Sequence, residues 1–166
     1  MSAAEELKAL MLAEPRWTLA VAESVTAGKL QARIASVSGA SSYFLGGITA
    51  YSLEQKVRHL GVERAHAEAV NCVSATVAEQ MARGVCRMFG AEVGAATTGY
   101  AEPAPQLGVS VPFAWWAVVV KTAKDAEFAV RTGLVEVAAA SRVEVQRRVA
   151  DAVIEEIAKA VTEARE

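Results

Sequence analysis

Residues 17–37 read WTLAVAESVTAGKLQARIASV, and this stretch decides the fold of the chain. The apolar run over residues 17–22 predicts a buried strand. Small residues follow within positions 23–28 and predict a tight turn, after which residues 29–37 predict a helix. We therefore expect a strand–turn–helix unit, which is a building block of α/β folds.

Strand and helix patterns alternate along the rest of the chain. Four further strands are predicted, over residues 43–52, 92–97, 113–121 and 126–135. Ser2, Ser74 and Ser141 each stand where a helix is predicted to begin, and Pro15 and Gly90 end the first two of these helices. In the last helix an apolar stripe predicts a face that packs on the core; its members are Val145, Val149, Val153, Ile157 and Val161.

The segments between these elements are predicted as connections. Residues 62–73 form a polar connection, and residues 101–112 form a loop because their prolines cannot donate hydrogen bonds to a sheet. Residues 122–125 connect the last two strands as an antiparallel hairpin, which makes the sheet mixed. We therefore expect a single layered α/β domain over residues 1–166, with a mixed sheet flanked by helices.

The composition is that of a globular protein without a basic surface. Of 166 residues, 53% are hydrophobic and 22% are charged, which is enough apolar material for a packed core. The net charge of −2 provides no basic face for nucleic acid, so no nucleic-acid partner is expected. The first seventeen residues hold no long apolar run, so neither a signal peptide nor a membrane span is predicted, and a cytoplasmic location is expected.

The cysteines and histidines do not form a recognisable metal site. Cys72 and Cys86 lie fourteen residues apart without a second pair, and this spacing fits neither a zinc motif nor a disulfide framework. His59 and His66 could share one helix face, but no acidic or cysteine cluster accompanies them. We therefore predict no metal and no cofactor.

Ser24 is the first candidate for chemistry. A serine directly after a buried strand, at the start of a helix, lies beside unpaired backbone N–H groups that could hold an oxyanion or a phosphate. Serine and threonine are also good helix N-caps, so a purely structural role remains open. A serine nucleophile needs a base, and the two histidines give a Ser-His-Asp triad little support.

Lys56 is the best alternative base by position. It follows the end of the predicted strand over residues 43–52, where burial could favour its neutral form. To act as a base, its pKa would have to fall from about 10.4 to near neutrality, which corresponds to about 4 kcal/mol. A solvated helix lysine beside Glu54 is the competing interpretation.

Three segments, in order, resemble one known family. They are AESVTAG at 22–28, SSYFLGGITAYSLEQKVRHLGV at 41–62 and TTGYAEP at 97–103. Together they are similar to the CinA C-terminal domain, the nicotinamide-nucleotide amidase family, and the similarity extends from about residue 7 to residue 161. The resemblance implies an α/β domain that self-associates, needs no metal, and deamidates nicotinamide mononucleotide to nicotinate mononucleotide and ammonia.

The resemblance also implies roles for individual residues. Ser24 matches the nucleophile, Lys56 the general base, and Tyr51 a hydroxyl that assists proton transfer or positioning. The implied substrate-binding residues come from three places in the chain: Thr26 and Gly28 in the loop of the oxyanion and phosphate region, Thr98 and Gly99 in a second substrate loop, and Arg142 as a phosphate ligand.

The chain departs from the family at several positions. The glycine-rich loop G-P-G-G-G of the family reads EPAPQ at 102–106, and P-V-G-T reads VPFA at 111–114. These changes add bulk, stiffness and a negative charge at Glu102, which is unfavourable beside an anionic nucleotide. Gln146 stands where the family has a second arginine. Ala27 replaces a glycine and is expected to fit with a negative φ.

Aromatic residues lie beside the altered loop. Tyr100, Trp115 and Trp116 could stack a flat ring, or they could fill a core or a subunit interface. Trp115 and Trp116 are neighbours in a predicted strand, so they should face opposite sides of the sheet.

Three functions therefore remain open. The chain is a nicotinamide mononucleotide amidase, an amidase of the same machinery that acts on a less anionic amide, or a catalytically silent ligand-binding or assembly module. In the first two cases the partner is a small-molecule nucleotide or amide, and a homo-oligomer is expected from the resemblance.

Overall fold

The computed structural model describes residues 1–122 and 127–166. Its five strands form one sheet in the order β2-β1-β3-β4-β5. β1 (Leu19–Glu23) lies between β2 (Phe44–Thr49) and β3 (Val93–Tyr100) and is parallel to both. β4 (Phe113–Lys121) and β5 (Phe128–Glu136) continue the sheet with antiparallel pairings. The predicted mixed sheet of a single α/β domain is therefore confirmed.

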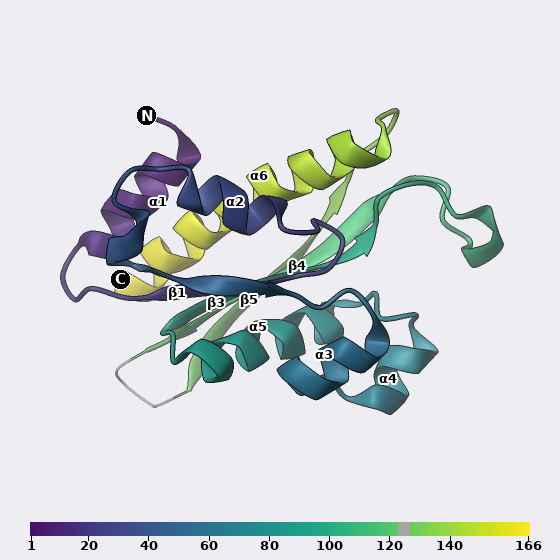
Figure 1. Ribbon diagram of the computed structural model, residues 1–166, viewed down its shortest axis with the longest axis horizontal. Helices are drawn as coiled ribbons and strands as arrows, with labels where there is room; N and C mark the ends of the chain where they lie inside the picture. The colour runs from purple at the N-terminus through teal and green to yellow at the C-terminus, as the bar shows by residue number, and fades with distance from the viewer. Residues whose placement is uncertain (123–126) are drawn as a thin grey trace.

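Helices cover both faces of the sheet (Figure 1). One layer consists of α1 (Ala3–Leu12), α2 (Lys29–Ala35) and α6 (Arg142–Arg165). The opposite layer consists of α3 (Leu53–Leu60), α4 (Arg64–Ala69) and α5 (Ala75–Phe89). Two short 3₁₀ turns, Ala40–Ser42 and Pro105–Leu107, lie in the connections.

The alternation of side chains along the strands divides the core into two clusters. In β1, Leu19 and Val21 pack with the α1, α2 and α6 layer, whereas Ala20 and Ala22 pack with the α3 and α5 layer. The predicted apolar stripe of α6 is buried along its whole length. Each layer of helices therefore gains its stability by covering one face of the same sheet.

The two adjacent tryptophans follow the same alternation. Trp116 is buried in the first cluster, and Trp115 packs against the second. The prediction that they face opposite sides is confirmed, and both fill space between the sheet and its helices.

Most predicted elements are present with shifted ends. The capping box of Ser2 and Glu5 opens α1, and Ser74 and Ser141 cap α5 and α6 as expected. β4 has the predicted bounds, whereas β2 is shorter than predicted and β3 runs further, to Tyr100. The hairpin turn predicted at 122–125 falls largely outside the described residues.

Sequence patterns missed two helices. α4 lies inside the predicted polar connection at 62–73, and no helix was assigned over α3. α4 has six residues and buries only Ala67, so it lacks the apolar repeat that identifies a helix. α3 has such a repeat in Leu53, Val57 and Leu60 after its N-cap Ser52, so the signal for this helix was present in the sequence.

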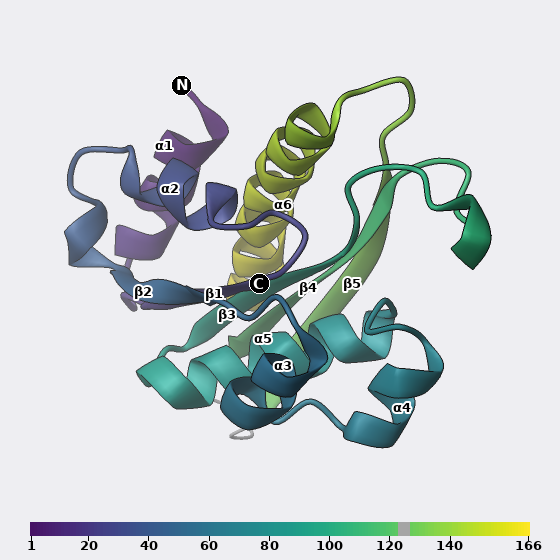
Figure 2. The same ribbon diagram turned by 45° about the vertical axis from the view of Figure 1, so that its right-hand side comes forward.

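The segment between β3 and β4 reaches away from the body of the sheet (Figure 2). It contains the 3₁₀ turn Pro105–Leu107 and one isolated bridge between Ala104 and Val109, so the predicted loop at 101–112 is essentially correct. Its base adjoins the carboxyl end of β3, which brings Glu102 close to the candidate site.

Arg165, near the end of α6, ties the two ends of the described chain together. Its guanidinium donates to the carbonyl oxygens of Leu10 and Pro15 at 3.0 Å and of Ala13 at 3.2 Å. It also lies 4.2 Å from the ring centroid of Trp17. Charged donors on several carbonyls hold the end of α1 and the turn before β1.

Replacing Arg165 by alanine should lower the free energy of unfolding by about 1–3 kcal/mol, because several carbonyls lose a charged donor. Urea unfolding of Arg165→Ala checks this. The control is Arg147→Ala, which removes an exposed arginine of the same helix that pairs with Glu144 and should change stability by less than about 0.5 kcal/mol. Equal losses in both variants would contradict this role of Arg165.

Candidate active site

Ser24 occupies the turn at the carboxyl end of β1. It is 7% exposed, and its backbone N–H donates to Thr97 Oγ1 of β3 at 3.4 Å. The carboxyl ends of the parallel strands β2 and β3 meet at the same edge of the sheet, which is where ligands of α/β proteins commonly bind. Residues far apart in sequence are thereby brought around one serine.

Lys56 comes from α3 and points at this serine. Its Nζ lies 2.8 Å from Ser24 Oγ and 2.9 Å from the carbonyl oxygen of Tyr51. The side chain is 1% exposed, so the interpretation as a solvated lysine is wrong. Burial lowers the pKa of Lys56 below its ordinary value, an effect that Cys72 partly opposes.

Ser24 is not a helix cap either. The N-cap of α2 is Gly28, whose φ of 95° is left-handed, and no side chain caps this helix end from that position. The hydroxyl of Ser24 instead pairs with Lys56. The left-handed backbone at position 28 therefore explains why a glycine stands there.

The backbone of Ala27 corrects one expectation. Its φ is 49°, not negative, so alanine adopts a left-handed conformation that favours glycine. The turn that carries Ser24 thus contains two successive left-handed residues, Ala27 and Gly28.

Glu23 is a site residue that the sequence analysis missed. Its carboxylate is fully buried; Oε1 accepts from Thr26 Oγ1 at 2.6 Å and from Leu30 N at 2.8 Å, and Oε2 accepts from Gln31 N at 3.0 Å. The signal was present, because a carboxylate that ends an otherwise apolar buried strand requires hydrogen-bond partners.

These contacts overturn part of the anion-site prediction. The first-turn N–H groups of Leu30 and Gln31 are already occupied by Glu23, and Lys29 N donates to Thr26 O. The N–H groups of residues 29–31 are therefore not available to a substrate phosphate.

Thr26 faces the interior. Its hydroxyl contacts both Glu23 and Thr97 Oγ1, the latter at 2.8 Å. Neither Thr26 nor Gly28 is among the described residues that line the cavity beside Ser24. The resemblance implies that these two residues contact the substrate, but the structure does not place them in the cavity wall. The Thr26 side chain instead bonds the turn to β3.

A cavity of about 300 Å³ opens beside the serine–lysine pair. Its lining includes Tyr51, Cys72, Thr98, Gly99 and Tyr100 in addition to Ser24 and Lys56. The structure thus brings the predicted Thr98 and Gly99 to the nucleophile. The volume lies at the low end of small-molecule sites.

Thr98 and Gly99 also have structural tasks. Thr98 Oγ1 donates to the carbonyl oxygen of Cys72 at 2.6 Å. A Cβ on Gly99 would lie 2.3 Å from the carbonyl oxygen of Phe113, so only glycine permits the close approach of β4.

Asn71 and Cys72 complete one wall of the cavity and were not predicted. Both have left-handed backbones, with φ of 50° and 62°. Asn71 Nδ2 donates to the Tyr100 hydroxyl at 3.2 Å. Asparagine tolerates this conformation, but the sequence alone offers no sign that the segment meets β3.

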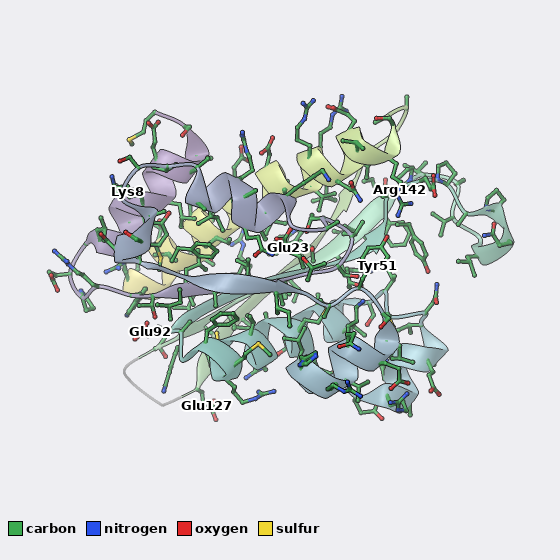
Figure 3. All side chains as sticks on the ribbon, viewed as in Figure 1. Lys8, Glu23, Tyr51, Glu92, Glu127 and Arg142 are labelled. Carbon is green, nitrogen blue, oxygen red and sulfur yellow. The ribbon has the colours of Figure 1, made fainter. Side chains whose placement is uncertain are left out.

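Tyr51 divides its contacts between the pair and the cavity mouth. Its carbonyl accepts from Lys56, whereas its hydroxyl accepts from Arg142 Nη2 at 2.7 Å. The Tyr51 side chain is 55% exposed, and Figure 3 shows it on the same side of the molecule as Arg142. The described hydrogen bonds place the hydroxyl on Arg142, so its part in proton transfer stays a prediction.

Arg142 also pairs with the altered loop. Its Nη1 lies 2.8 Å from Glu102 Oε1, so the predicted phosphate ligand is already bound to a carboxylate. Gln146, which stands in place of the second arginine of the family, accepts from Lys29 Nζ at 2.9 Å.

Among the residues that the structure describes, no three His, Cys, Asp or Glu side chains gather as a group that could hold a metal ion. Among the described helices, none combines the length and apolar composition that crossing a membrane requires.

Fold and site together define an α/β domain that carries a buried serine–lysine pair at the carboxyl ends of its parallel strands. The model of the CinA C-terminal domain matches residues 1–161, and the chain belongs to this family. A CinA-like protein of Chlorobium limicola is 39% identical over 152 residues, which is 92% of this chain and 35% of that relative. A CinA-like protein of Picosynechococcus is 52% identical over 86 residues, which is 52% of this chain and 20% of the relative.

This chain therefore spans about a third or less of the length of these curated relatives.

Solved structures share its fold. A CinA superfamily protein of Klebsiella pneumoniae has a TM-score of 0.83 at 19% identity, with coverage of 98% of this chain and 99% of the other. One from Enterobacter cloacae has a TM-score of 0.84 at 22% identity, with coverage of 97% and 93%.

Glu23→Gln should lower the free energy of unfolding by about 1–3 kcal/mol, because an amide cannot accept all three hydrogen bonds and leaves a buried donor unpaired. Urea unfolding measures the loss. Glu155→Gln on the exposed face of α6 is the control, with an expected change below about 0.5 kcal/mol. A Glu23→Gln protein as stable as the control would show that the carboxylate does not hold the turn.

Proposed function

We propose that this chain is an amidohydrolase in which Ser24 is the nucleophile and Lys56 the base, and that it converts nicotinamide mononucleotide to nicotinate mononucleotide and ammonia. The observation that carries the proposal is the distance of 2.8 Å between Lys56 Nζ and Ser24 Oγ, with the lysine almost fully buried. A separation beyond about 4 Å, with the lysine in solvent, would have favoured a catalytically silent module.

Burial gives Lys56 the property that a base needs. Desolvation disfavours the charged ammonium, and the lowered pKa increases the fraction of neutral amine near neutrality. When Lys56 is charged, Nζ donates to Ser24 Oγ. When it is neutral, the same short distance lets the serine hydroxyl donate to Nζ, which is the geometry of proton abstraction.

The reaction then follows in two steps. Ser24 Oγ attacks the carboxamide carbon while its proton passes to Lys56, and the tetrahedral intermediate collapses when the C–N bond breaks and Lys56 returns the proton to the leaving ammonia. Water, deprotonated by Lys56, hydrolyses the acyl-enzyme and restores Ser24. Val25 lines the cavity, and in the described part of the chain its backbone N–H donates to no protein acceptor, so it is available to the oxyanion.

The shape of the site suits a small planar amide. The cavity of about 300 Å³ is lined by Tyr100 and Thr98 beside the nucleophile, and the half-exposed Tyr51 marks its mouth. A pyridine carboxamide would enter with its amide toward Ser24, and its ribose phosphate would remain at the mouth near Arg142.

A second candidate substrate is a less anionic amide processed by the same residues. The ion pair between Arg142 and Glu102 favours it, because the arginine nearest the mouth is already neutralised.

Ser24→Ala should reduce ammonia release from nicotinamide mononucleotide at least about 1,000-fold, since no other group takes over the covalent step. A coupled ammonia assay measures the rate. Ser41→Ala, an exposed serine without a described side-chain hydrogen bond, is the matched control and should retain full activity. Activity that survives in Ser24→Ala would exclude the covalent mechanism.

The pH dependence of kcat/KM should report Lys56. The rate should rise with pH as the lysine loses its proton and should level off below the range of an ordinary lysine, because burial lowers this pKa. Lys56→Arg, which stays protonated, should be inactive at every pH. A profile without an acidic limb, or an active arginine variant, would argue against a lysine base.

The same pKa shift should appear in stability. Between the lowered pKa of folded Lys56 and the ordinary value near 10.4, the unfolded chain binds more protons than the folded one, so the free energy of unfolding rises with pH across this window. Lys56→Met should remove this contribution to the slope. Urea unfolding at several pH values compares the two proteins, and identical slopes would show that Lys56 is charged in the folded state.

A further inference from the structure

The geometry at the cavity mouth points to Glu102 as a specificity-determining residue. We propose that its carboxylate occupies Arg142, so that the site disfavours amides that carry a phosphate dianion and favours those that do not. The inference rests on the proposed amidase function, because it concerns which amide reaches Ser24.

Three segments meet at this point of the mouth. Arg142 is the first residue of α6, and its two terminal nitrogens contact different partners: Nη2 lies 2.7 Å from the Tyr51 hydroxyl, and Nη1 lies 2.8 Å from Glu102 Oε1. Tyr51 lines the cavity, whereas Glu102 comes from the segment after β3. The arginine thus joins the cavity rim to the carboxylate.

Other cations of the described residues have partners of their own. Lys56 is buried against Ser24, Lys29 donates to the uncharged amide of Gln146, and both Arg147 and Arg148 pair with Glu144. Arg142 is the cation that contacts Tyr51 of the cavity lining, and Glu102 already neutralises it. The N–H groups of Leu30 and Gln31 in the first turn of α2 offer no substitute, because Glu23 already accepts from them.

A phosphate at Arg142 must displace Glu102 or lie beside it. The Arg142 and Glu102 side chains are 45% and 60% exposed, so the competition takes place in water, where an ion pair or a like-charge contact changes affinity by roughly fivefold. An amide without a phosphate does not compete for Arg142, so Glu102 leaves its binding unchanged.

Nicotinamide mononucleotide and nicotinamide riboside form a matched pair of probes, since they share the pyridinium carboxamide and differ in the phosphate. Calorimetry on Ser24→Ala protein, which cannot turn the amide over, compares Glu102 with Glu102→Gln. We expect Glu102→Gln to tighten binding of the mononucleotide about fivefold and to leave the riboside unchanged. High salt should shrink the gain.

Two controls sharpen the comparison. Glu155→Gln removes one exposed carboxylate far from the mouth along α6 and should alter neither affinity. In an Arg142→Met background the Glu102→Gln gain should be smaller; an undiminished gain would show that Glu102 does not act by occupying Arg142, and would overturn the proposal.

Unchanged or weaker binding of the mononucleotide to Glu102→Gln would also overturn the proposal, since weaker binding would mean that Glu102 orients Arg142 for the phosphate. Failure of both ligands to bind Glu102→Gln would overturn it too, because the freed arginine must accept a phosphate. These binding results do not depend on hydrolysis, whereas the proposed function fails if wild-type protein releases no ammonia from nicotinamide mononucleotide.

Discussion

The buried carboxylate of Glu23 holds together the part of the molecule on which the rest depends. It ends β1 and accepts hydrogen bonds from the turn and from the first turn of α2, and Thr26 extends the network to Thr97 of β3. A charge removed from water needs such partners, because an uncompensated carboxylate would be very unfavourable. These hydrogen bonds therefore hold the strand, the turn and the helix in one arrangement, and Ser24 lies in the turn.

The environment of Lys56 shows how a fold can produce a reactive side chain without unusual residues. α3 places the amine against Ser24 and the Tyr51 carbonyl, and residues 71–73 line the cavity beside it. Desolvation then favours the neutral amine. In the proposed mechanism, packing lowers the pKa of Lys56, and its proximity to Ser24 sets the direction of proton transfer.

The mouth of the cavity differs from its buried interior in exposure and in the strength of its contacts. Its residues are exposed, and its contacts are ion pairs and single hydrogen bonds whose strengths are small in water. Such a rim can change with little effect on the core, because the altered 101–112 loop projects from the body (Figure 2). Under the proposed function, substitutions at this rim change substrate choice while the serine–lysine pair stays in place.

The sequence by itself determined the mixed α/β sheet and most of its elements, and its ordered motifs pointed to Ser24 and Lys56. The spacing of apolar residues, helix caps and short motifs are local signals, so they can be read without the tertiary structure. The sequence could not predict α4, which buries one residue, or the wall of Asn71 and Cys72, whose hydrogen-bond partners lie in β3. It also left Lys56 open between a solvated and a buried role. Only the tertiary structure decided these points, since burial and charge pairing depend on which distant residues the fold brings together.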